Sequence, residues 1–99
     1  MKIQQITERI GTGAITNISI LGLHTGDLII AVLYQGHQYP LTNMTNNNIK
    51  LFRSPKYVLN YLRENGINKV DVNLTQWDKT KVFDAHDRAM QLRKKQEVS

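Results

Sequence analysis

The sequence predicts an α+β fold, in which an antiparallel sheet carries helices on one face. Three observations support this class. The first half of the chain has three strand-like segments separated by short turns, as in a hairpin meander. The second half has two helix-like segments around one further strand, and the chain shows no regular strand–helix–strand alternation. We therefore expect a three-stranded meander plus one or two further strands and two helices, in the order βββ(β)αβα.

The first residues leave two interpretations open. Ile3, Ile6 and Ile10 recur at helical spacing, but a short extended arm over residues 1–12 fits the same pattern. The two glycines around Thr12 end the segment in either case.

The meander is predicted over residues 14–42. In residues 14–23 β-branched side chains dominate, as in a strand. Residues 28–34, LIIAVLY, are apolar on both faces of the pleat, which predicts a central strand with both faces covered. A third strand returns over residues 37–42. Pro40 makes it short, bulged or an edge strand, because proline has no N–H to donate.

The clearest local signature begins a helix at Ser54. Serine is a good N-cap, and Pro55 suits the first helical position. Gly66 suits the left-handed position that follows a helix, so we expect the helix to end there. Residues 49–53 lead into this helix either as a further strand or as an extended segment.

Two more elements follow. Residues 69–74 alternate polar and apolar side chains, so Val70, Val72 and Leu74 are predicted to share one face of a half-buried strand. A second helix is predicted over about 79–96. Its apolar stripe consists of Val82, Phe83, Ala85, His86, Ala89, Met90 and Leu92.

Length and composition fit one globular domain over residues 1–99, with residues 93–99 expected to be a frayed tail. The chain has no cysteine, which excludes disulfides and thiolate metal sites and suits a reducing cytosol. The N-terminus lacks the apolar core and cleavage site of a secretory signal. The longest apolar run, residues 28–34, falls short of the ~20 residues that span a bilayer. We therefore expect a cytoplasmic protein with no membrane association.

The net charge of +5 lies entirely in the second half of the chain. Residues 1–49 carry two basic and two acidic side chains, whereas residues 50–99 carry eleven basic and six acidic ones. No acidic residue stands between Asp27 and Glu64. Such an asymmetry creates a local positive field that attracts nucleic acid or other anionic surfaces. The alternative is that the charge simply keeps a small protein in solution.

Basic side chains around the helix that begins at Ser54 are the first candidates for phosphate contacts. Each phosphate that a protein neutralises adds salt-sensitive affinity. The alternative is a solvated helix face. A second basic group ends the C-terminal helix, where cations are also favoured by the helix dipole. The candidates are Lys50, Arg53, Lys56, Arg63 and Lys69 in the first group and Arg88, Arg93, Lys94 and Lys95 in the second.

Aromatic residues are the other candidates. Tyr34 and Tyr39 flank a turn of the meander and are predicted to stack on unpaired bases, which contributes about 1–3 kcal/mol per base. The alternative is that they cover the sheet edge or bury a dimer contact. Tyr57 is expected in or near the core. Trp77 is expected to fasten the second helix to the sheet.

No catalytic residue, metal ligand or cofactor is predicted. Asp84, His86 and Asp87 form the only dense carboxylate–imidazole group, but Asp84 and His86 diverge on a helix and two carboxylates make a poor metal site. No Walker or dinucleotide glycine pattern occurs. We therefore do not expect an enzyme.

One segment carries a resemblance. Residues 52–78, FRSPKYVLNYLRENGINKVDVNLTQWD, combine an Arg-Ser-Pro helix start, a Tyr-Leu helix end, Gly-Ile, an alternating strand and Gln-Trp. This segment resembles small uncharacterised proteins carried on enterobacterial plasmids. The resemblance implies a plasmid-maintenance or DNA-transaction context, and it transfers no role to any particular residue.

These observations predict a small basic cytoplasmic protein that binds nucleic acid, DNA rather than RNA, through phosphate contacts. A homodimer is expected, because residues 28–34 need cover on both faces and two short helices cover only one. The alternative is a non-enzymatic interaction module whose basic surface binds an acidic protein partner. An apolar patch that stays exposed would distinguish that alternative.

Overall fold

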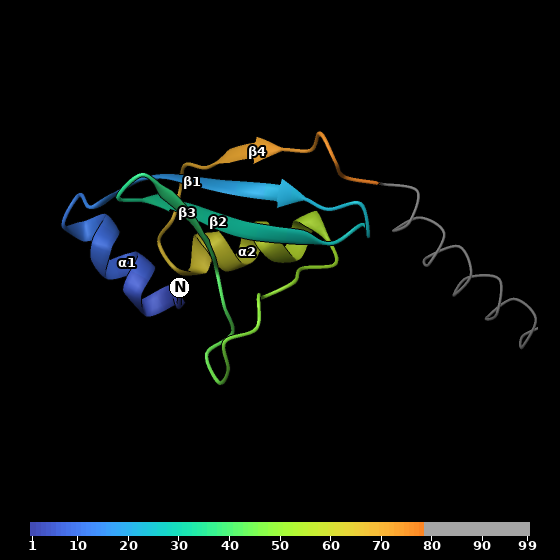
Figure 1. The fold of residues 1–99 in the computed structure, drawn as a ribbon. Helices are drawn as coiled ribbons and strands as arrows, with labels where there is room; N and C mark the ends of the chain where they lie inside the picture. The colour runs from blue at the N-terminus through green and yellow to red at the C-terminus, as the bar shows by residue number, and fades with distance from the viewer. Residues whose placement is uncertain (79–99) are drawn as a thin grey trace, which may run out of the picture.

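The computed structural model describes residues 1–78 of the 99-residue chain. The predicted α+β class is confirmed, with two helices and a four-stranded sheet. The predicted helix over 79–96 and the predicted tail lie outside the described residues. The elements in Figure 1 are α1 (Ile3–Gly11), β1 (Ile15–Gly22), β2 (Leu28–Tyr34), β3 (His37–Pro40), α2 (Pro55–Glu64) and β4 (Asp71–Asn73).

The N-terminal segment is a helix and not an extended arm. Ile6 of α1 is fully buried, and Ile3 and Ile10 pack against the same core from the edge. The backbone N–H of Lys2 donates to Oε1 of Gln5 at 3.0 Å, which satisfies one of the donors that a helix start leaves free. The isoleucine spacing therefore gives the apolar side of an amphipathic helix.

The sheet has the strand order β3-β2-β1-β4. The predicted meander is confirmed, because β1–β2 and β2–β3 both pair antiparallel. The prediction of a purely antiparallel sheet was wrong, since β4 pairs parallel to β1, with Ser19 opposite Asp71. The reason is topological: α2 carries the chain from the β3 edge to the far edge, so β4 enters in the direction of β1.

The core lies between the sheet and the two helices, which cover the same face (Figure 1). Alternate side chains of β1 and β2 point into it, as the twofold period of a strand requires. Neither described helix has the length and apolar character of a bilayer-spanning segment. The buried cluster includes Ile6 from α1, Ile18 and Ile20 from β1, Ile30 and Val32 from β2, and Val58 and Leu62 from α2.

Residues 50–52 form an extended segment that leads into α2. Phe52 and Leu28 exchange two backbone hydrogen bonds, at 2.7 and 2.8 Å. The N–H of Lys50 donates to the carbonyl oxygen of Leu41 at 2.9 Å. The segment thus continues the sheet edge beyond Pro40, where β3 ends, and it places Lys50 beside α2.

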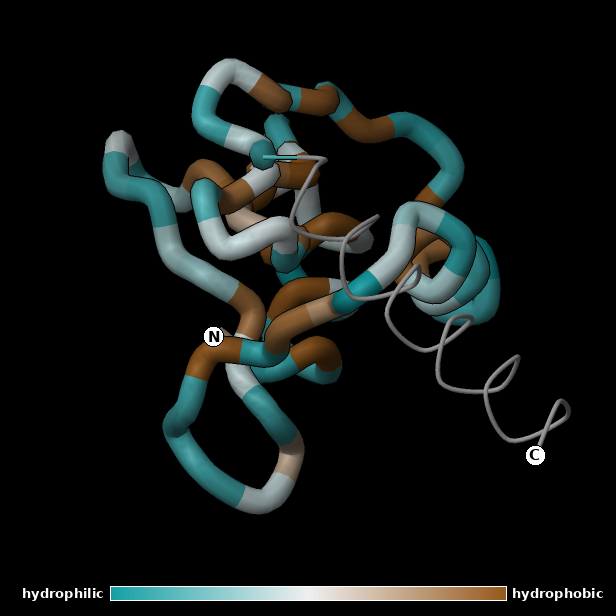
Figure 2. The backbone as a smooth tube through the Cα atoms, turned by 90° about the vertical axis from the view of Figure 1, so that its right-hand side faces the viewer, coloured by the Kyte–Doolittle hydropathy of each residue, from teal (hydrophilic) through white to brown (hydrophobic). Residues whose placement is uncertain are grey.

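The loop of residues 42–49 projects from the body in Figure 1 and is mostly hydrophilic in Figure 2. Lys2 holds this loop against the start of α1. Its ammonium group donates to the carbonyl oxygens of Asn43 at 2.5 Å and Asn46 at 2.7 Å. The asparagine-rich segment is therefore an ordered turn fastened by a cation from the other end of the chain.

The strand predicted over 69–74 is present, but its predicted burial was wrong. It is reduced to the three residues of β4, and Val72 is 55% exposed. Leu74 is exposed as well, while Val70 packs partly against the core. β4 pairs on one side only, and all three of its residues are exposed. The alternation of polar and apolar residues over 69–74 therefore belongs to a short edge strand and not to a half-buried one.

Candidate nucleic-acid interface

Helix α2 is the scaffold of the predicted phosphate-binding residues. The hydroxyl of Ser54 accepts a hydrogen bond from the N–H of Tyr57 at 3.3 Å, and Pro55 occupies the first turn, so the predicted helix start is confirmed. Val58 and Leu62 are buried, which turns Lys56 and its neighbours on the opposite side to solvent. Because Pro55 has no N–H and Ser54 occupies that of Tyr57, anion binding here depends on side chains more than on the helix terminus.

Lys50 is positioned by aromatic rings. Its ammonium nitrogen lies 5.4 Å from the ring centre of Tyr61 and 5.6 Å from that of Phe52, within cation–π range. Burial raises the pKa of Tyr61 above its ordinary value, so the phenol stays neutral at physiological pH. The ring therefore orients the lysine without neutralising its charge.

Arg53, Lys56 and Arg63 extend the positive charge along α2, and all three are exposed. Arg63 donates through Nη1 to Oδ1 of Asn68 at 2.9 Å, a neutral partner that leaves its charge in place. Within the described part of the chain, no carboxylate contacts Arg53 or Lys56. Lys50, Arg53, Lys56 and Arg63 together are called the α2 cation strip below.

Lys69 stands apart from the α2 cation strip. It precedes β4 and lines a small hollow with Thr16 and Asn17 at the start of β1. Lys50 lies at the opposite edge of the sheet, beside the end of β3. The structure therefore places Lys56 and Arg63 on α2 and Lys50 and Arg53 in the segment just before it, and it leaves Lys69 at the far edge of the sheet. The second group, Arg88, Arg93, Lys94 and Lys95, lies outside the described residues.

Tyr34 and Tyr39 lie beside each other, with their ring centres 6.2 Å apart. Every second side chain of β2 points toward the helices, and Tyr34 is one of these. Tyr39 is the register partner of the buried Val32, so its ring lies on the same side of the sheet. The guanidinium of Arg9 lies 4.4 Å from the ring centre of Tyr34 and covers one of its faces. Base stacking by the two tyrosines stays a prediction, and Tyr39 is the more accessible ring.

Tyr57 was expected in or near the core, and that prediction was wrong. Its side chain is 66% exposed, because it lies about 100° around the helix from Val58. Leu59 and Leu51 are also more than half exposed, at 53% and 54%. The exposure of Leu59 could have been predicted from the sequence, because at 3.6 residues per turn Leu59 falls outside the stripe of Val58 and Leu62. The surface of α2 is thus both basic and apolar.

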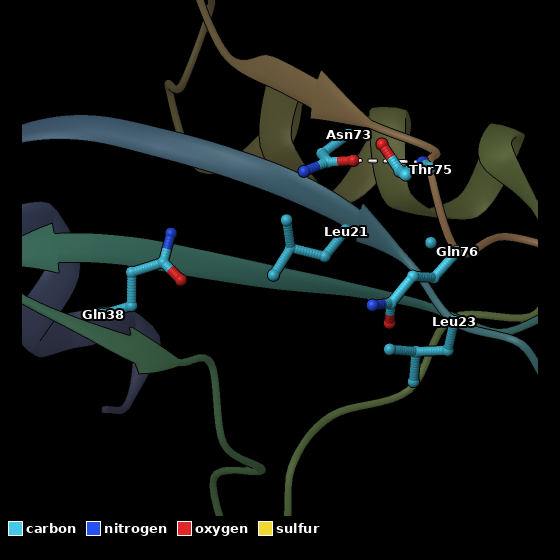
Figure 3. A pocket seen from close by; sticks show the side chains of 7 residues that line it. Leu21, Leu23, Gln38, Asn73, Thr75 and Gln76 are labelled. Atoms are coloured by element: carbon cyan, nitrogen blue, oxygen red, sulfur yellow. Dashed lines mark hydrogen bonds between the residues drawn. The ribbon is translucent and has the colours of Figure 1, made fainter.

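A hollow of about 340 Å³ lies on the opposite, uncovered face of the sheet. In Figure 3 the side chains of Leu21, Gln38 and Gln76 stand on the near side of the strands, while α2 lies behind them. Amide, hydroxyl and aliphatic groups line it, with no ionisable side chain. The lining offers neither a general acid nor a general base.

Metal-ligating side chains do not gather in the part of the chain that the structure describes. No three His, Asp or Glu residues stand close enough there to hold an ion. The Asp84, His86 and Asp87 group lies outside the described residues.

No protein-family model, curated protein or solved structure matches the chain. The resemblance of residues 52–78 to plasmid-borne proteins therefore stays a prediction.

Proposed function

We propose that this is a small cytoplasmic protein that binds nucleic acid, with DNA as the preferred ligand, through its phosphate backbone. The observation that carries the proposal is the α2 cation strip, in which Lys56 and Arg63 lie on the exposed side of α2 and Lys50 and Arg53 lie in the segment that leads into it. No described carboxylate contacts Arg53 or Lys56. Unpaired surface cations release condensed counterions when they neutralise phosphates, which drives binding without reading base sequence.

The geometry of the strip suits a backbone ligand. Lys56 and Arg63 are seven residues apart on α2, which corresponds to about 10 Å along the helix axis. Tyr57 adds an exposed ring on the flank of the same helix. Backbone cations beside an accessible ring are the combination that binds unpaired strands, because every base has a face on which a ring can stack.

A second candidate function rests on the exposed leucines. Leu51 and Leu59 lie in the same segment as Arg53 and Lys56, so an acidic protein partner with apolar side chains fits this surface as well. Apolar burial depends weakly on salt, whereas phosphate contacts depend on it strongly. Salt dependence therefore separates the two candidates. The predicted homodimer and the plasmid context stay predictions.

The test is fluorescence anisotropy of labelled single-stranded DNA, duplex DNA and RNA, each at 50 and 200 mM salt. We expect micromolar binding whose log–log slope against salt corresponds to several phosphates, at about 0.7–0.9 per contact. Lys56→Ala is expected to lower the slope by about one contact.

Gln4→Glu is the matched control. It also lowers the net charge by one, but at an exposed position of α1. It should leave the slope close to that of the unmodified protein. Absence of binding at 50 mM salt would overturn the proposal, as would equal effects of Lys56→Ala and Gln4→Glu. Capture of a protein partner that weakens with Leu59→Ser and barely responds to salt would favour the second candidate.

A further inference from the structure

Tyr57 presents an unoccupied aromatic ring on the surface of α2. Its side chain is 66% exposed, more than any other large apolar or aromatic side chain in residues 1–78. Its backbone N–H is bonded to Ser54, but no described residue makes a hydrogen bond or a ring contact with its side chain. A single exposed ring is common on protein surfaces, so the groups that surround Tyr57 decide what it can bind.

The other two candidate stacking rings are less accessible. The guanidinium of Arg9 covers one face of Tyr34, and the ring of Tyr39 lies beside that of Tyr34 with its side chain 37% exposed. A base needs a free ring face on which to stack. Tyr57 is therefore the best placed of the three tyrosines for this contact.

Cations flank Tyr57 on two sides. Lys56, the preceding residue, is exposed and lies about 100° away around the helix. On the other side is Tyr61, one turn further along the same face, whose ring centre lies 5.4 Å from the ammonium nitrogen of Lys50. Tyr57 thus lies between the positions of two charges of the α2 cation strip.

A carboxylate limits where phosphates can lie on this side of α2. Glu64 is exposed and follows Tyr57 by seven residues, or two turns and about 10 Å along the axis. Its charge repels a phosphate, whereas Lys50 and Lys56 attract one. On the Tyr57 side of the helix, phosphates are therefore favoured near the beginning of α2, where the ring lies.

We propose that Tyr57 stacks on an unpaired base, so that the α2 cation strip binds single-stranded DNA in preference to duplex DNA. The inference rests on the proposed function and narrows its ligand. In a duplex, neighbouring bases cover both faces of each base, and a side chain can enter only by unstacking them. In a single strand a base turns toward the ring without that cost. Stacking on Tyr57 therefore adds affinity for single strands only.

Salt separates stacking from phosphate contacts. The log–log slope of affinity against salt is about 0.7 per phosphate contact for single strands and about 0.9 for duplex DNA. Stacking releases no condensed counterions, so its contribution persists as salt rises. The preference for single-stranded over duplex DNA is therefore expected to increase between 50 and 200 mM salt.

The test measures variants of the full chain against two single-stranded probes by fluorescence anisotropy. One probe is an ordinary oligonucleotide, and the other is an abasic oligomer of the same length and charge. Tyr57→Leu keeps an apolar side chain but removes the ring, so it is expected to weaken binding of the first probe roughly tenfold and to leave the abasic probe unaffected. Tyr57→Phe keeps the ring and should bind both probes as the unmodified protein does. Lys56→Ala should weaken both probes alike.

The outcomes distinguish this inference from the proposed function. Equal weakening of both probes by Tyr57→Leu, or no weakening of either, would overturn the stacking role while phosphate binding stands. A loss in Tyr57→Phe as large as that in Tyr57→Leu would also overturn it, because the hydroxyl and not the ring would then make the contact. Duplex DNA bound as tightly as single-stranded DNA at 200 mM salt would overturn the strand preference. Absence of binding to every probe at 50 mM salt would overturn both the inference and the proposed function.

Discussion

Trp77 occupies the space that a side chain on Gly22 would need. A Cβ built on Gly22 would overlap the Cβ and the indole ring of Trp77. The indole Nε1 donates to the carbonyl oxygen of Gly26 at 2.9 Å, and the ring packs against the core. Trp77 was expected to fasten the second helix to the sheet. Within the described residues it fastens the chain after β4 to the end of the β1–β2 hairpin.

Gly22→Ala is expected to lower the free energy of unfolding by about 1–3 kcal/mol, because the overlap involves a Cβ that no rotamer change can move. Urea unfolding followed by the fluorescence of Trp77 measures the change. Gly11→Ala is the control, since a Cβ there meets nothing within 4 Å. It should be neutral or gain up to about 1 kcal/mol at the end of a helix. Equal losses in both variants would show that the contact with Trp77 is not what matters.

Ser54→Ala is expected to lower the free energy of unfolding by about 1 kcal/mol, because the N–H of Tyr57 loses its acceptor at the start of α2. Asn60→Ala, exposed in the same helix, should have little effect or stabilise slightly. Chemical denaturation of both variants, compared with their helical circular dichroism, checks the prediction. A loss in Asn60→Ala as large as that in Ser54→Ala would contradict it.

Tyr61 is expected to ionise above the ordinary tyrosine pKa, because burial disfavours its phenolate. The neutral phenol fits the folded state equally well at every pH below the ordinary value of 10.0. Above it the unfolded chain releases the proton more easily, so stability falls as pH rises toward the folded pKa. Absorbance near 295 nm follows the ionisation of the tyrosines as pH is raised. The ionisation step at the highest pH should be missing in Tyr61→Phe. Loss of an earlier component would refute the assignment.

Lys2→Met is expected to loosen the loop of residues 42–49 without weakening nucleic-acid binding, because the ammonium of Lys2 is engaged by Asn43 and Asn46. Lys56→Met removes the same charge from the α2 cation strip. It should weaken nucleic-acid binding without loosening the loop. Amide hydrogen exchange of the loop and the salt slope of DNA binding separate the two effects. Equal weakening of binding by both variants would mean that only net charge matters.

The parts of the fold that the sequence predicts well are those with local causes. The start of α2 follows from Ser54 and Pro55, and the meander follows from β-branched segments separated by short turns. The parallel pairing of β4 has no local cause, since it depends on the path of α2 across the sheet. The exposure of Val72 follows from the same path, because an edge position gives it neighbours on one side only.

In the candidate site too, the features with local causes could be predicted and those that depend on distant contacts could not. Charge segregation in the sequence was enough to predict cations along α2. The separation of Lys69 from Lys50 was not predictable, because it depends on which strands form the sheet edges. The stacking of Arg9 on Tyr34 joins residues 25 positions apart in sequence, and neither residue carries a motif that announces the contact. Long-range contacts of this kind come from the packing of α1 on the sheet.

The parallel pairing of β1 with β4 has a consequence for how the protein folds. Ser19 and Asp71 are 52 positions apart, whereas the β1–β2 hairpin joins neighbours through a short turn. Closing a long loop costs chain entropy before the new contacts offset it, and distant contacts slow folding. The hairpin should therefore form early and β4 should dock late. Substitutions at Val72 would then mainly accelerate unfolding, while those at Ile20 would slow folding.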